Sequence, residues 1–178
     1  ELVNLFLDTC SRQVVAHGGQ VSKYVGDCVM AHFPPDAADL AIRACVETLR
    51  EIQALRGSAG RCRLQKYLYC GFGLSKGLVI EGNIGSSIKM DYTVLGDIVN
   101  LAARLEGLTR NIGKAIALSE PVRDACREGW HFERAGEFRL KGQSQPQPIY
   151  SITVPVVDDI KTYRQILDDM EELCCELS

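Results

Sequence analysis

Two side chains with hydrogen-bonding chemistry, Asn100 and Arg104, lie four residues apart near the middle of the chain. In an α-helix this spacing places an amide and a guanidinium on the same face. Together they suit a negative charge that develops on a phosphoryl group, because both side chains donate hydrogen bonds to phosphate oxygens. A solvated polar face on a core helix explains the same pattern, and spacing alone favours that simpler interpretation.

The stretch 89–108, KMDYTVLGDIVNLAARLEGL, positions this polar pair by changing from strand to helix. Residues 91–95 are rich in aromatic and β-branched types, which favour strands, and the segment 82–90 is expected to be a flexible connection into them. Gly96 breaks the run, and Asp97 is expected as the helix N-cap because its carboxylate can accept free backbone N–H groups. The predicted apolar stripe of the helix comprises Ile98, Leu101, Ala102 and Leu105.

A second candidate group lies in a predicted hairpin. Residues 21–25 and 28–33 are typical of short strands, and Gly26 with Asp27 forms a two-residue turn that tolerates a positive φ at its first position. Lys23 and Asp27 are therefore expected near the tip. Aspartate is common in turns and lysine is common on edge strands, so these residues by themselves also fit a purely structural role.

Three ordered blocks of the chain resemble the signature motifs of class III nucleotidyl cyclases, the adenylyl and guanylyl cyclases. They read GGQVSKYVGDCVMAHF at 18–33, DYTVLGDIVNLAARLE at 91–106 and LKGQSQPQPIYSI at 140–152. Three motifs in the right order are more specific than any one of them. Within that family, the chain most resembles the blue-light-activated adenylyl cyclases of the euglenoid kind, which carry flavin-binding BLUF modules.

The resemblance assigns metal binding and base recognition to the predicted hairpin and to the strand before the helix. Asp27 matches a metal-binding aspartate, and Lys23 and Thr93 match the positions that face the purine. A lysine ammonium donates to adenine N1, and a threonine hydroxyl can accept from the exocyclic amine. Guanine reverses this pattern and would require a carboxylate in place of the lysine, so the pair predicts ATP as the substrate.

In this family the ribose 3′-hydroxyl attacks the α-phosphorus of ATP, and cyclic AMP and pyrophosphate are formed. Two divalent metal ions, Mg²⁺ or Mn²⁺, would lower the pKa of the hydroxyl and bind phosphate oxygens. Asn100 would orient the ribose, Arg104 would stabilise charge on the reacting phosphate, and Lys141 would neutralise the leaving phosphates. The active site would form between two head-to-tail cyclase domains, in a homodimer or a tandem pair.

The fold implied by the resemblance is a ferredoxin-like palm of the α/β (α+β) class, with a mostly antiparallel sheet and helices on one face. Residues 1–154 would form the catalytic domain, and residues 155–178 an amphipathic linker or dimer helix. The family's first strand carries a metal aspartate and is missing ahead of the helix predicted at 1–16. An upstream strand with an aspartate would favour an enzyme over a pseudo-cyclase that binds nucleotide without turnover. A ferredoxin-like binding module whose motif matches are accidental is a further alternative.

Composition fits one ordinary globular domain of 178 residues with 46% apolar residues and a net charge of -3. This charge gives no support for a nucleic-acid partner, and no apolar run predicts membrane insertion. The eight cysteines form no CxxC pair and share no ligand spacing with the three histidines, so we expect reduced thiols rather than a zinc site. A cytoplasmic location is expected, flagellar if the euglenoid likeness extends that far. Flavin is expected only if BLUF modules exist outside this chain.

Overall fold

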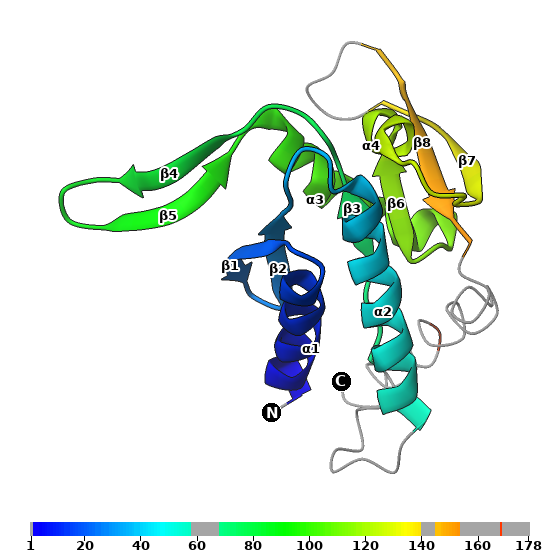
Figure 1. The fold of residues 1–178 in the computed structure, drawn as a ribbon, viewed down its shortest axis with the longest axis horizontal. Helices are drawn as coiled ribbons and strands as arrows, with labels where there is room; N and C mark the ends of the chain where they lie inside the picture. Colours follow the sequence, from blue (N-terminus) through cyan, green and yellow to red (C-terminus); the bar gives the residue numbers. More distant parts are fainter. Residues whose placement is uncertain (1, 58–67, 140–144, 154–167, 169–178) are drawn as a thin grey trace.

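The computed structural model describes residues 2–57, 68–139, 145–153 and 168 (Figure 1). Its helices are α1 (Leu2–Ala16), α2 (Ala38–Gly57), α3 (Asp97–Ile112) and α4 (Glu120–Ala125). Its strands are β1 (Gln20–Val25), β2 (Cys28–His32), β3 (Phe72–Leu74), β4 (Ile80–Gly85), β5 (Met90–Leu95), β6 (Ile116–Ser119), β7 (Phe132–Phe138) and β8 (Gln147–Ile152). Within these ranges, no helix has the length and apolar character needed to span a membrane. The helix predicted at 155–178 falls outside the described residues, apart from residue 168.

The strands form one sheet and two hairpins. The sheet has the order β3-β6-β8-β7, with β3 parallel to β6 and the other pairs antiparallel. Strands β1 and β2 form one antiparallel hairpin, and β4 and β5 form another, which extends away from the rest of the molecule (Figure 1). We call this second hairpin, residues 78–95, the arm. Mixed helices and mainly antiparallel strands confirm the predicted α+β class.

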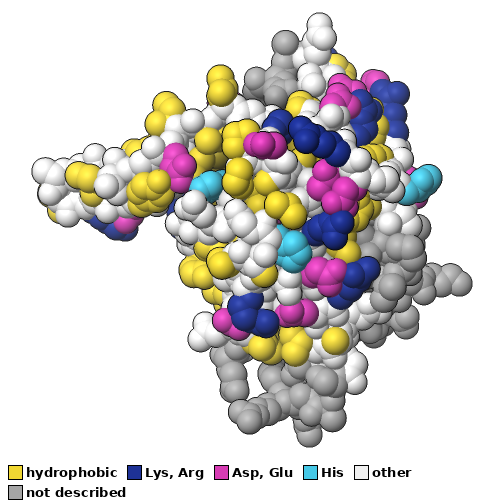
Figure 2. Space-filling view, in the orientation of Figure 1, with side chains coloured by type: hydrophobic (Ala, Val, Ile, Leu, Met, Phe, Trp, Pro, Cys, Tyr) yellow, Lys and Arg dark blue, Asp and Glu magenta, His cyan; other side chains and the backbone are white. Residues whose placement is uncertain are grey.

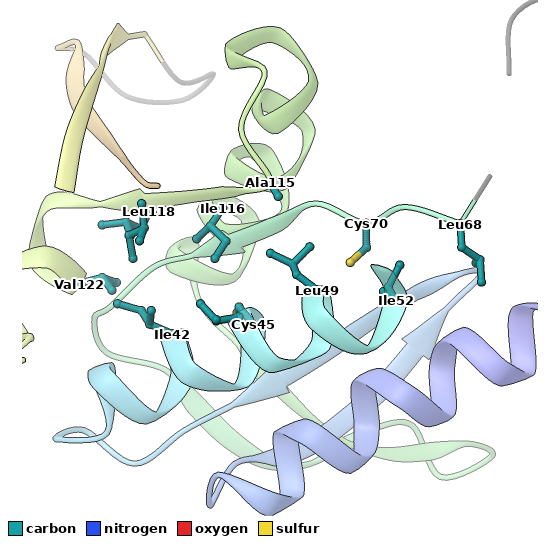
Figure 3. Close-up of a cluster of buried hydrophobic side chains, with 12 residues drawn as sticks. Ile42, Cys45, Leu49, Ile52, Leu68, Cys70, Ala115, Ile116, Leu118 and Val122 are labelled. Atoms are coloured by element: carbon teal, nitrogen blue, oxygen red, sulfur yellow. The ribbon is translucent and has the colours of Figure 1, made fainter. Parts of the chain in front are cut away.

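The main core lies between α2 and the sheet. Strand β6 is buried along its whole length, as expected for an apolar strand covered on both faces. Its Ile116 and Leu118 pack against Ile42, Cys45 and other side chains of α2 (Figure 3). These contacts remove apolar surface from water and fix the sheet relative to the long helix.

The helix α3 covers the opposite face of the same sheet. Its Leu105 packs with Ala117 of β6 and Ile149 of β8, and successive residues of a strand point to opposite faces. The helices therefore cover both faces of this sheet, which corrects the expectation of helices on one face. Close packing requires Gly73 of β3, since a Cβ there would lie 2.0 Å from the carbonyl oxygen of Ala102.

The start of α3 differs by one residue from the expectation. Gly96 is the N-cap, and Asp97 is the first helical residue rather than the cap. No side chain caps this end, but a carboxylate in the first turn still interacts favourably with the positive end of the helix dipole. The helix ends at Gly113, whose φ of 65° is the left-handed conformation that glycine adopts easily.

Candidate functional site

The polar face of α3 is exposed, as predicted from the spacing of Asn100 and Arg104. Both side chains are accessible to solvent, while Leu105 on the buried face is 0% exposed. Within the described part of the chain, neither polar side chain has a hydrogen bond or an ion pair. The helix therefore presents an amide and a guanidinium that are available to bind a group from outside.

The hairpin β1–β2 carries Lys23 and Asp27, as predicted. Gly26 has a φ of 62°, so the turn has the positive φ expected at its first position. Asp27 is exposed at the tip and makes no hydrogen bond or ion pair to any described residue. The hairpin contacts α1 through Tyr24, whose hydroxyl oxygen is 2.9 Å from the hydroxyl oxygen of Ser11.

Thr93 lies in β5 with 6% of its surface exposed. Its hydroxyl oxygen is buried and has no hydrogen-bond partner among the described residues. A buried polar group without a partner destabilises a protein, so such groups are normally paired or reserved for a ligand. Strand β1 lies against β5, which brings the strand of Lys23 next to the strand of Thr93.

The other candidate residues make no direct polar interaction with one another among the described residues. Helix α3 packs on β3 and β6, and no hydrogen bond or ion pair joins Asn100 or Arg104 to Asp27 within the described chain. Lys141 falls outside the described residues, so its predicted phosphate contact stays a prediction. The described residues contain no group of three or more His, Cys, Asp or Glu side chains that could hold a metal ion.

The cysteines near this region are free thiols with raised pKa values. Burial raises the pKa of Cys10 to about 12. The pKa of Cys28, next to Asp27, is raised by burial and then by the charges of Glu106 and Asp27. A thiol becomes a strong nucleophile or metal ligand only when deprotonated. The raised pKa values keep both thiols protonated at neutral pH, although Cys28 is exposed.

The arm exposes apolar side chains that the sequence interpretation missed. Leu78 is 96% exposed and Ile88 is 95% exposed, and the whole apolar set is Leu78, Val79, Ile80, Ile88, Met90, Tyr92 and Leu95. Figure 2 shows hydrophobic side chains along the arm. The segment 82–90 was expected as a flexible connection, but most of it forms paired strands closed by a hydrogen bond from the Ser86 N–H to the Lys89 carbonyl. The apolar residues on both sides of the glycines were the available signal for paired strands.

A family model described as the adenylate and guanylate cyclase catalytic domain matches residues 2–163. Photoactivated adenylate cyclase subunit alpha from Euglena gracilis is 38% identical over 126 residues, which cover 69% of this chain and 12% of that protein. Adenylate cyclase 1 from Rhizobium meliloti is 28% identical over 166 residues, covering 90% of this chain and 25% of that protein. The chain therefore spans a small part of these curated relatives.

Solved structures with the same fold include a bacterial light-regulated adenylyl cyclase with a TM-score of 0.86 and 40% identity. The alignment covers 96% of this chain and 49% of that one. The adenylyl cyclase CyaB from P. aeruginosa aligns with a TM-score of 0.74 and 28% identity over 88% of this chain and 83% of that chain. These likenesses confirm the palm-type fold that the motifs predicted.

Proposed function

The chain belongs to the family of adenylate and guanylate cyclase catalytic domains, and on that premise we propose that it converts ATP to cyclic AMP and pyrophosphate. Relatives named as adenylate or adenylyl cyclases support this choice of nucleotide. The observation that carries the proposal is the buried, unpaired hydroxyl of Thr93 beside the strand of Lys23. A purine base bound there would give that hydroxyl the partner it lacks within the described residues.

Adenine fits the donors and acceptors of this pair. The Lys23 ammonium can only donate, and adenine N1 can only accept. The Thr93 hydroxyl can accept from the exocyclic amine of adenine. Guanine would direct its N1–H at the ammonium and leave two donors facing each other, which costs about 1–3 kcal/mol for each unpaired buried group.

The exposed residues of α3 suit the reacting part of the nucleotide. Asn100 would hold the ribose so that its 3′-hydroxyl is in line with the α-phosphorus. Arg104 would donate to the phosphate oxygens on which charge increases in the transition state. Lys141 would bind the leaving phosphates. Because these donors would act on charge that appears during reaction, they would raise kcat more than they improve ATP affinity.

Asp27 fits one part of a metal site. Its carboxylate is exposed and unpaired among the described residues, and carboxylate oxygen is the ligand that Mg²⁺ and Mn²⁺ prefer. The bound metal ions would lower the pKa of the attacking hydroxyl and neutralise phosphate charge. A second carboxylate would come from a strand that precedes α1. Strands β2 and β3, each with one edge unpaired among the described residues, would pair with it.

We assign the two groups of residues to a site shared by two cyclase domains. One domain would supply Asp27, and the other would supply Lys23, Thr93, Asn100 and Arg104. Asn100 and Arg104 make no hydrogen bond or ion pair to Asp27 within the described chain, which is consistent with this division. The exposed apolar side chains of the arm give a second domain a surface to cover.

The test is cyclic AMP formation from ATP with Mg²⁺ or Mn²⁺ by the protein that includes the residues before α1. We expect turnover in the parent, none in Asp27→Ala, and little in residues 1–178 alone, which would lack one metal carboxylate. Asp36→Ala is the matched control, because Asp36 is also an exposed aspartate beyond a strand end and has no assigned role. Near-normal activity of Asp27→Ala would make the hairpin tip a simple turn.

A nucleotide-binding pseudo-cyclase is the second candidate. An upstream strand without an aspartate would favour it, because Asp27 would then be the single carboxylate assigned to the metal ions. In that case the extended parent would bind ATP and form a dimer, but it would make no cyclic AMP with either metal. Binding and turnover measured on the same sample therefore distinguish the two functions.

A further inference from the structure

A β-bulge at Ser22 determines which face of the hairpin carries Lys23. Val21 pairs with Ala31 and Lys23 pairs with Met30, so Ser22 is an extra residue in β1. Strict alternation from Val21 would place Lys23 on the face that packs on α1. The extra residue reverses this order, so that Tyr24 reaches Ser11 of α1 and Lys23 faces the other way.

The imidazole of His32 connects this bulge to the arm. Its Nδ1 is 2.9 Å from the hydroxyl oxygen of Ser22, and its Nε2 is 3.0 Å from a carboxylate oxygen of Glu81 in β4. The contact between Nε2 and Glu81 lies within ion-pair distance. Where Nε2 carries the proton that faces this carboxylate and the ring is neutral, Nδ1 accepts from the Ser22 hydroxyl. The side chains of His32 and Glu81 are 23% and 35% exposed, so their contact is partly shielded from water.

Glu81 lies close to Thr93 in the pairing of β4 with β5. Glu81 pairs with Val94, and the next residue, Gly82, pairs with Thr93. A hydrogen bond from Tyr92 to the Glu81 carboxylate raises the pKa of the Tyr92 phenol, so Glu81 is held from β5 as well. A continuous series of contacts therefore runs from the residue before Lys23 to the strand pair that contains Thr93.

We propose that His32, bonded to Ser22 and Glu81, is a positioning residue that sets the base preference by fixing Lys23 relative to Thr93. This inference rests on the proposed function. The ring contacts neither the base nor the reacting atoms. It acts by holding the bulge that directs Lys23 and by tying that bulge to the strand pair of Thr93. Loss of either contact would leave Lys23 and Thr93 in their strands, but the distance between the two side chains would be less well fixed.

The experiment compares kcat/KM for ATP and GTP in the full protein and in two variants, Ser22→Ala and His32→Phe. We expect the preference for ATP to fall about tenfold in each, the order of effect of one lost hydrogen bond. The KM for ATP should change more than kcat, because the charge on the phosphates is stabilised elsewhere. Ser22→Thr keeps a hydroxyl and should retain the parent preference. Ser11→Ala removes the bond on the other face of β1 and should also leave the preference unchanged.

The double variant Ser22→Ala/His32→Phe gives the sharpest test. Two residues that act through one bond should together cost no more than either alone, whereas independent effects would add. Additive losses, or equal losses in Ser22→Thr and Ser22→Ala, would overturn the inference. If His32→Phe fails to fold, the single variant Glu81→Val is measured in its place. It removes the other contact of the ring, and an unchanged ATP preference in this variant would overturn the inference.

An active parent whose variants keep the ATP preference would overturn the role of His32 and leave the proposed function intact. A parent that makes no cyclic AMP would overturn both. The two failures are therefore separated by the parent measurement alone.

Discussion

The body of the molecule and the arm treat apolar side chains in opposite ways. Between α2 and the four-stranded sheet, Ile42, Ile116 and Leu118 are each 0% exposed. On the arm, Leu78 and Ile88 are 96% and 95% exposed. The body covers these core side chains with its own residues. The apolar surface of the arm can be covered only by something outside the described chain.

A similar contrast separates two sets of polar side chains within the body. In the body, the carboxylate of Asp39 accepts from the backbone N–H groups of Arg127 and Glu128 and from the indole N–H of Trp130. The candidate site residues on α3 and on the β1–β2 hairpin have no such partners among the described residues. We therefore propose that the body serves as a scaffold, and that these unpaired groups lie where nucleotide and a second domain would bind.

The largest effect is expected at the unpaired residues of α3. Asn100→Ala and Arg104→Ala should each lower kcat by about 10²–10³, the cost of removing one donor that acts on transition-state charge. The melting temperature should not change, because neither side chain has a partner in the described fold. Asn111→Ala, an exposed asparagine in the last turn of the same helix, is the control. A rise in KM with unchanged kcat would assign these residues to ground-state binding.

The next effect concerns stability and compares the two regions directly. Ile116→Ala in the core should lower the free energy of unfolding by about 2–5 kcal/mol, because the buried site loses apolar contacts and gains a cavity. Ile88→Ala on the arm should stay within about 0.5 kcal/mol in the monomer. Urea unfolding at low protein concentration measures both. Equal losses would mean that the arm is packed against the body in solution.

A smaller effect is expected for self-association through the arm. Ile88→Asp should weaken dimerisation at least about tenfold, since a desolvated carboxylate costs more than one ordinary hydrogen bond. Sedimentation of parent and variant over a range of concentrations measures the change. Val15→Asp, at an exposed valine of α1 with 64% exposure, is the control. A similar change in both variants would show that charge alone, and not the arm, controls association.

The smallest effect is a pH dependence of the body at Asp39. Burial alone would raise the pKa of this carboxyl, but hydrogen bonds from Arg127, Trp130 and Glu128 outweigh it and lower the pKa below its ordinary value of 3.8. The stability it contributes is therefore present above about pH 4 and is lost as the pH falls through the folded-state pKa. The urea concentration at the unfolding midpoint, measured from about pH 6 to about pH 3, should fall more steeply in the parent than in Asp39→Asn. Parallel curves would show that Asp39 is not linked to folding.

Local patterns predicted the parts of the site that depend on local structure. The spacing of Asn100 and Arg104 placed both on the exposed face of α3, because that face is determined by the helical repeat and by Leu105. Gly26 predicted the hairpin turn through its positive φ. The order of the motifs predicted the palm-type fold, because the family they resemble has that fold.

Features that depend on contacts between distant segments were not predicted. The hydroxyl of Ser22 at the bulge contacts His32, which in turn contacts Glu81, and nothing near Ser22 in the sequence indicates those partners. Residues 82–90 of the arm were expected to be a flexible connection because glycines interrupt their apolar pattern, although the strand at 91–95 was predicted. The position of α3 on one face of the sheet depends on Gly73 of β3, because a Cβ there would clash with the helix. Gly73 and the helix residue that approaches it are far apart in the sequence.

The most direct test of the shared site is a mixing experiment with two inactive variants of the full protein, Asp27→Ala and Asn100→Ala. Each homodimer would lack one required group in both of its sites. A mixed dimer would contain one site with both changes and one site with neither. Cyclic AMP formation should therefore appear on mixing and should approach about a quarter of the parent rate in an equal mixture, because half of the dimers would each carry one intact site. No recovery, with mixed dimers confirmed by a tag on one variant, would contradict the claim that two chains complete the site.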